Sequence, residues 1–105
     1  MKSPQRARQL SKQNILKTLV KYRPDIRRYK VQKLGLFGSF AKGTFHHQSD
    51  IDLLVKFGEP TFDNYMELKF LLEKIFHRKV DLVIEDNLKK ELQYIKKEVH
   101  YVRGL

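Results

Sequence analysis

Two apolar runs in the middle of the chain are joined by a short polar stretch, and each run meets that stretch at a chemically distinctive motif. The first run ends at Gly38-Ser39, and the second begins with Asp50-Ile51-Asp52 after ten intervening residues. Side chains alternate across a strand, so Asp50 and Asp52 share one face while Ile51 points to the other. The pattern predicts a strand whose apolar side packs on helices and whose acidic side stays open.

The residue types at the two motifs suit a site for a metal and a phosphate chain. Gly38 has no side chain and lets the backbone approach a ligand closely. Ser39 offers a hydroxyl and an amide N–H at the start of a predicted short helix, and helix N-termini attract phosphate. Lys42 adds a positive charge nearby. Asp50 and Asp52 repel each other unless a cation lies between them, and Mg²⁺ prefers such oxygen ligands.

The segments Gly-Ser-Phe-Ala-Lys-Gly and Ser-Asp-Ile-Asp-Leu carry a family resemblance. Together they resemble the active-site signature of the DNA polymerase β-like nucleotidyltransferase superfamily. Within it, the chain is most similar to the minimal nucleotidyltransferases, which are antitoxin-type partners of HEPN toxins. The match is specific over residues 34–55 and extends through the order of elements to about residue 102. The resemblance implies an α/β (α+β) fold with a small mixed sheet and helices packed on one face.

The family uses a third carboxylate on a later strand, and Asp81 is the acid inside the apolar run Val80–Ile84. The alternative reading of Asp81 is an aspartate that faces water on an edge strand. The implied reaction is in-line attack by an acceptor hydroxyl on the α-phosphorus of ATP, with pyrophosphate leaving and two Mg²⁺ ions assisting. The resemblance assigns Asp50, Asp52 and Asp81 to catalysis and metal binding, and Gly38 and Ser39, with Lys42, to the phosphates.

Hydrophobic periodicity predicts an alternation of helices and strands along the rest of the chain. We expect residues 1–105 to form one minimal nucleotidyltransferase domain, with residues 1–30 as its basic, helical N-terminal segment. The predicted strands are 31–37, 51–57 and 80–84, with a short edge strand near Tyr101. The predicted helices follow Ser11, cover 25–29, run from Thr61 or Asp63 to about His77, and follow the stripe Leu88, Leu92, Ile95 and Val99.

Charge is distributed unevenly along the chain. The net charge is +10, and residues 1–30 carry ten Lys or Arg against one acid. Such a segment favours an acidic partner, protein or nucleic acid, although a solvated basic helix is the simpler explanation. The chain has no cysteine, which excludes a disulfide framework. It also lacks an apolar run of the roughly 20 residues that a membrane span needs. We therefore expect a soluble, cytoplasmic protein.

The leading functional hypothesis is an enzyme. It would transfer AMP from ATP, with Mg²⁺, to a hydroxyl of a HEPN toxin, a tyrosine in particular, and so act as the antitoxin. Two alternatives from other classes remain. One is an antitoxin that neutralises its partner by binding alone. The other is a nucleic-acid-binding or nucleic-acid-modifying module that uses the basic N-terminal segment.

Overall fold

The computed structural model describes residues 10–105, so the first nine residues of the predicted basic segment lie outside the described part of the chain. Four strands form one sheet in the order β3-β2-β1-β4. The central strand β2 runs antiparallel to β1 and parallel to β3, and β4 runs antiparallel to β1. The sheet is therefore mixed, and the predicted fold class is confirmed. The strands are β1 Val31–Phe37, β2 Ile51–Phe57, β3 Val80–Ile84 and β4 His100–Tyr101.

The helices begin and end where local chemistry favours it. Helix α2, Lys12–Lys21, starts after Ser11, whose side chain accepts a hydrogen bond of 3.1 Å from a backbone N–H of the first turn. The short helix α3, Arg23–Arg27, has a proline in its first turn, where no backbone N–H is needed. Helix α5, Phe62–Phe76, is capped by Thr61 in the same way and ends in a left-handed residue. None of the helices within residues 10–105 has the length and apolar content to cross a bilayer.

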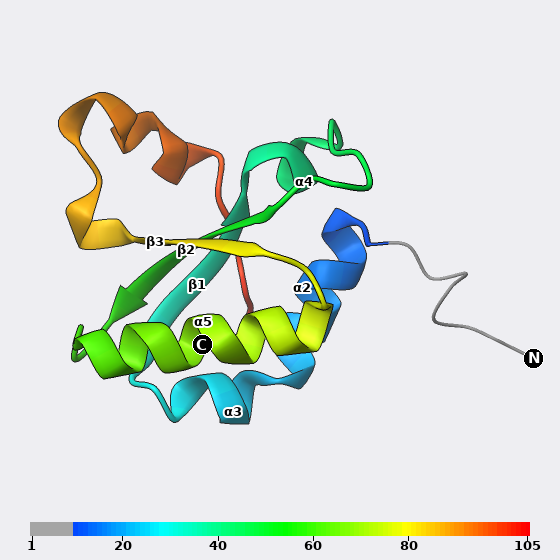
Figure 1. Cartoon of the computed structure of the whole chain (residues 1–105). Helices are drawn as coiled ribbons and strands as arrows, with labels where there is room; N and C mark the ends of the chain where they lie inside the picture. The colour runs from blue at the N-terminus through cyan, green and yellow to red at the C-terminus, as the bar shows by residue number, and fades with distance from the viewer. Residues whose placement is uncertain (1–9) are drawn as a thin grey trace, which may run out of the picture.

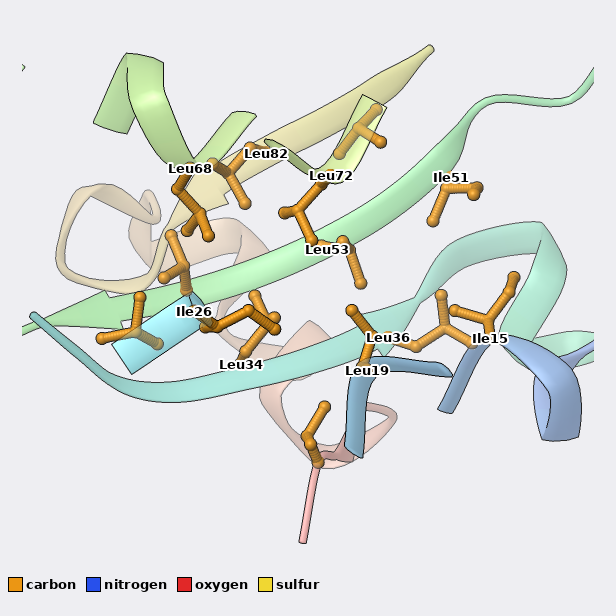
Figure 2. Close-up of a cluster of buried hydrophobic side chains, with 14 of the residues drawn as sticks. Ile15, Leu19, Ile26, Leu34, Leu36, Ile51, Leu53, Leu68, Leu72 and Leu82 are labelled. Carbon is orange, nitrogen blue, oxygen red and sulfur yellow. The ribbon is translucent and has the colours of Figure 1, made fainter. Parts of the chain in front are cut away.

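The hydrophobic core lies between one face of the sheet and the α-helices (Figure 2). Alternate residues of β1 and β2 point into it and meet the inner faces of α2, α3 and α5. Burying a Leu or Ile side chain contributes about 1.5–3 kcal/mol, so this face supplies most of the stabilisation. The residues with no exposed surface in this cluster are Ile15, Leu19, Ile26, Leu34, Leu36, Ile51, Leu53, Val55, Leu68 and Leu72.

The other face of the sheet is only partly covered. Alternation places Gly35 and its cross-strand partner Leu54 on this face. A Cβ atom at Gly35 would collide with Val99 and touch Tyr101, so the C-terminal segment lies directly against the strand there. Figure 1 shows this segment, in orange, on the side of the sheet opposite α5. The expectation of helices on one face therefore holds for α2, α3 and α5, while the segment after β3 covers part of the second face.

The prediction of an α-helix along the stripe from Leu88 to Val99 is wrong. The structure has two 3₁₀-helices there, η1 Glu85–Asn87 and η2 Lys90–Lys97, and no residue of η2 is buried. Apolar spacing identified an amphipathic segment but not a surface for it to pack on. Most helical stability in proteins comes from packing an apolar face, and η2 lacks that support within the described residues.

Candidate active site

The two parallel strands at one side of the sheet bring two acidic side chains together. The register of β2 and β3 places Asp52 directly opposite Asp81. Both lie on the face away from the core, because their neighbours Ile51, Leu53 and Leu82 point into it. Asp81 is exposed and on an edge strand, as the alternative reading supposed, yet it faces another carboxylate.

The carboxylate pair is electrostatically strained when no cation is present. The pKa of Asp52 rises from 3.8 to about 6, first because the side chain is half-buried and then because Asp81 and Asp50 repel its charge. A side-chain hydrogen bond with Asp81 raises the pKa further. A hydrogen bond between two carboxyl groups requires a proton, which Asp52 holds below a pH of about 6 and loses above it. Asp50 precedes β2, is exposed, and acts on Asp52 through its charge.

The carboxylates of Asp52 and Asp81 fit a Mg²⁺ site in which substrate phosphates supply further ligands. Within residues 10–105, no three Asp, Glu or His side chains converge into a preformed metal cluster. Mg²⁺ is commonly held by one or two carboxylates together with substrate phosphates, because it keeps several open coordination positions. Asp52 and Asp81 supply adjacent hard oxygen donors, and their mutual repulsion is what a divalent cation would relieve.

The Gly-Ser motif lies beside this pair. Gly38 opens the short helix α4, Gly38–Lys42, with a φ of 77° that favours glycine. A Cβ atom at Gly38 would collide with the carboxylate of Asp52, so the close approach requires glycine here. The N-cap residue Phe37 forms no side-chain capping bond, which leaves the first N–H groups of α4 without that partner. The structure thus joins the two halves of the motif, with Ser39 half-buried in the first turn.

Lys42 lies at the other end of α4. Its ammonium nitrogen is 3.7 Å from a carboxylate oxygen of Glu98, and both side chains are exposed. An exposed ion pair of this kind contributes about 0–1 kcal/mol. The observed contact of Lys42 is therefore with the C-terminal segment rather than with the carboxylate pair.

A comparison with known proteins identifies the family. The sequence profile of the nucleotidyltransferase domain matches residues 13–103. The chain belongs to the nucleotidyltransferase family. A relative from Thermococcus cleftensis, named protein adenylyltransferase MntA, is 34% identical over 96 residues, which cover 89% of this chain and 97% of the relative. The expected enzyme class, a nucleotidyltransferase, is therefore confirmed.

Several solved structures similar to this nucleotidyltransferase are toxin–antitoxin complexes. One, a toxin–antitoxin with AMP-PNP, has a chain with a TM-score of 0.66 and 27% identity, covering 82% of this chain and 73% of that one. Another, the toxin–antitoxin MntA–HepT, has a TM-score of 0.61 and 25% identity, covering 89% of this chain and 73% of that one. A further similar structure is that of a minimal nucleotidyltransferase, with a TM-score of 0.67 and 33% identity, covering 80% of this chain and 92% of that one, and it confirms the resemblance to this group.

Arg78 is a residue of this nucleotidyltransferase that sequence reasoning missed. Its guanidinium donates hydrogen bonds to the carbonyl oxygens of His47, at 2.7 Å, and Ser49, at 2.8 Å. It also lies 5.5 Å from the ring centre of Phe40, which stacks on Phe45 at 4.3 Å. Arg78 therefore fixes the loop that joins the two motif halves. Its carbonyl partners are 31 and 29 residues away in sequence, so no local pattern signals the contact.

Two side chains of α5 hold β3 in place. The Tyr65 hydroxyl donates a hydrogen bond of 2.7 Å to the carbonyl of Leu82. The Glu73 carboxylate accepts one of 3.0 Å from the N–H of Val80. These contacts fix the backbone on either side of Asp81, so α5 sets the position of the carboxylate that faces Asp52.

Proposed function

We propose that this nucleotidyltransferase transfers AMP from ATP, with Mg²⁺, to a tyrosine hydroxyl of a HEPN toxin and thereby acts as its antitoxin. The observation that carries the proposal is the placement of Asp52 opposite Asp81, with Gly38 against the Asp52 carboxylate. Two comparisons support the substrate and the partner. The Thermococcus cleftensis relative is named a protein adenylyltransferase, and one similar toxin–antitoxin structure contains AMP-PNP.

In the proposed reaction the acceptor oxygen forms a bond to the α-phosphorus, and the bond from that phosphorus to the bridging oxygen breaks, so pyrophosphate leaves. Bound Mg²⁺ would neutralise phosphate charge and favour the deprotonated acceptor. Asp50, Asp52 and Asp81 would hold the metal. Asp81, the more exposed member of the facing pair, would accept the acceptor's proton. The backbone N–H groups of Gly38 and Ser39 would bind the β- and γ-phosphates.

Neutralisation by binding alone is the alternative account of an antitoxin. The carboxylate pair argues against it, because a half-buried Asp52 that is repelled by Asp81 is costly to a fold unless the pair serves a site. A protein that acted only by covering its partner would not need Asp52 to lie opposite Asp81. It would also not need glycine at position 38, where a side chain would collide with the Asp52 carboxylate.

A labelling experiment tests the proposal. The protein is incubated with a HEPN-domain toxin, Mg²⁺ and each of the four labelled nucleoside triphosphates in turn, and mass spectrometry locates the modified residue. We expect label from ATP on a toxin tyrosine, and none when a chelator removes the metal. Neutralisation of the toxin without label transfer would establish the binding-only account. Label on a different residue type would correct the acceptor.

A further inference from the structure

A groove of about 860 Å³ opens on the helix side of the molecule, and the carboxylate pair is not part of its lining. Its walls come from α2, from the loop after α4 and from the end of α5, which meet at the right of Figure 1. Neither Asp50, Asp52 nor Asp81 lines it. Its lining includes Leu10, Lys17, Lys21, Phe40, His47 and Arg78.

The groove is positively charged, and none of the residues from 10 to 105 that line it is acidic. Lys17, Lys21 and Arg78 contribute cations, and three histidines lie among the remaining lining residues. The ion pairs formed within residues 10–105 involve other lysines, so Lys17 and Lys21 have no carboxylate partner there. The nine residues that precede Leu10 in the sequence contain two arginines, one lysine and no acid, so they cannot neutralise the groove either.

The apolar part of the lining favours a protein segment over a nucleic acid. Sequence-tolerant binding of single strands depends on aromatic rings that are free to stack on bases. Of the Phe and Tyr rings in the lining, Phe40 and Phe76 are buried, and Tyr22 and Phe45 are half-buried and packed against the core. Apolar groups beneath a basic rim instead suit a segment that carries both acids and aliphatic side chains.

We propose that this groove docks an acidic segment of a partner protein, with carboxylates on Lys17 and Lys21 and aliphatic side chains in the apolar part. Under the proposed function that partner is the toxin, and only the partner's identity rests on that function. The anchor would be separate from the carboxylate face where the acceptor hydroxyl reacts. The loop that lines the groove at His47 is also the loop that leads to Asp50, so both surfaces share one structural element.

The test uses a defined probe and a pair of matched variants. The probe is a short fluorescent peptide of alternating glutamate and leucine, whose binding is followed by polarisation at low and physiological salt. Lys17→Glu with Lys21→Glu reverses charge inside the groove. Arg28→Glu with Lys30→Glu changes the net charge by the same amount at exposed positions outside it, and each pair alters one residue near a helix C-terminus.

We expect the groove pair to weaken peptide binding by about tenfold and the control pair by less than about twofold, with binding falling as salt rises. Equal losses in the two variants would show non-specific charge attraction and overturn the proposal. Tighter binding of a single-stranded RNA, or of inorganic tripolyphosphate, with the same dependence on Lys17 and Lys21 would overturn it in favour of another anion.

A second readout separates this inference from the proposed function. Peptide binding needs neither nucleotide nor toxin, so it can succeed or fail whatever the labelling experiment shows. Where label transfer to the toxin is observed, the groove pair should raise the KM for the toxin and leave kcat unchanged. A lower kcat with an unchanged KM would contradict a docking role.

Discussion

On the helix side of the sheet, Leu34, Leu36 and Leu53 have no exposed surface, whereas on the other side Asp52 and Asp81 face each other and repel. The two sets of side chains alternate along the same strands, so they share one backbone framework. The first face gains free energy from burial, and the second carries a charge arrangement that burial makes less favourable. Stability and chemistry should therefore respond to different substitutions.

The largest effect is expected on the carboxylate face. Asp50→Asn with Asp52→Asn should lower the rate of label transfer by about a thousandfold or more, because metal-based charge stabilisation contributes several kcal/mol to such reactions. The variant should still fold and bind the toxin, since the core side of β2 is untouched. A thermal melt and a toxin pull-down provide the controls. Transfer at the parent rate would remove these aspartates from the catalytic assignment.

Leu72→Ala should show the opposite behaviour. Leu72 has no exposed surface and lies in the core beneath the sheet, so its truncation should lower the free energy of unfolding by about 3 kcal/mol. Urea denaturation measures this loss, with the exposed Phe70→Ala on the same helix as the control. Transfer by the folded fraction should stay at the parent rate. A proportional loss of transfer in fully folded protein would break the separation of the two faces.

Arg78 lies between the two faces, because it contacts both the buried Phe40 and the loop that leads to Asp50. Arg78→Met removes the two hydrogen bonds to the loop and should lower kcat by about tenfold. Hydrogen bonds from a charged donor contribute roughly 1.5–3 kcal/mol each, and the loop carbonyls recover part of this free energy by bonding to water. Arg78→Lys, which keeps a donor, should recover part of kcat, while the KM for ATP changes little. Equal melting temperatures and equal kcat in all three proteins would show that the loop is held by other contacts.

The smallest effect is a pH dependence of stability in metal-free protein. The ordinary pKa of this side chain is 3.8 and the fold raises the pKa of Asp52 to about 6, so the folded protein binds the proton more tightly than the unfolded chain does. That contribution is complete below pH 3.8 and is lost as pH rises through about 6. Because the side chain is half-buried and partly screened, Asp52→Asn should gain about 1 kcal/mol relative to the parent between pH 4 and 7. Chelator-treated samples in urea titrations test this, and a constant difference across pH would contradict it.

The sequence predicted the three longer strands and the caps of α2 and α5 because their signals are local. Apolar runs bounded by glycine or a polar residue mark a strand, and Ser11 and Thr61 bond to N–H groups three residues away. The place of Asp52 on the open face of β2 followed from alternation, whereas Asp50 lies just before the strand, so its shared face with Asp52 stays a prediction. The register that sets Asp52 against Asp81 could not be predicted from periodicity, because it depends on how α5 returns the chain to the sheet.

Two features escaped prediction for a related reason. Arg78 acts on carbonyl groups in a distant loop, and no spacing rule connects such positions. The stripe from Leu88 to Val99 has helical spacing, yet spacing does not report whether a surface exists to receive it. In the structure only its end, at Val99, reaches the sheet closely enough to require a glycine beneath it.

The two-residue strand β4 has a consequence for the order in which the sheet opens. It pairs only with Gly35 and Leu36, and the next backbone bond, from Val102 to Leu34, closes the ladder at 2.8 Å. Segments held by few hydrogen bonds at a sheet edge exchange their amide protons through local opening, well before global unfolding. The amides of His100 and Tyr101 should therefore exchange with solvent faster than those of β2. Each such opening lifts Val99 and Tyr101 from Gly35 and briefly exposes the backbone edge of β1 that faces away from β2, together with Gly35 on the face of the sheet that carries Asp52.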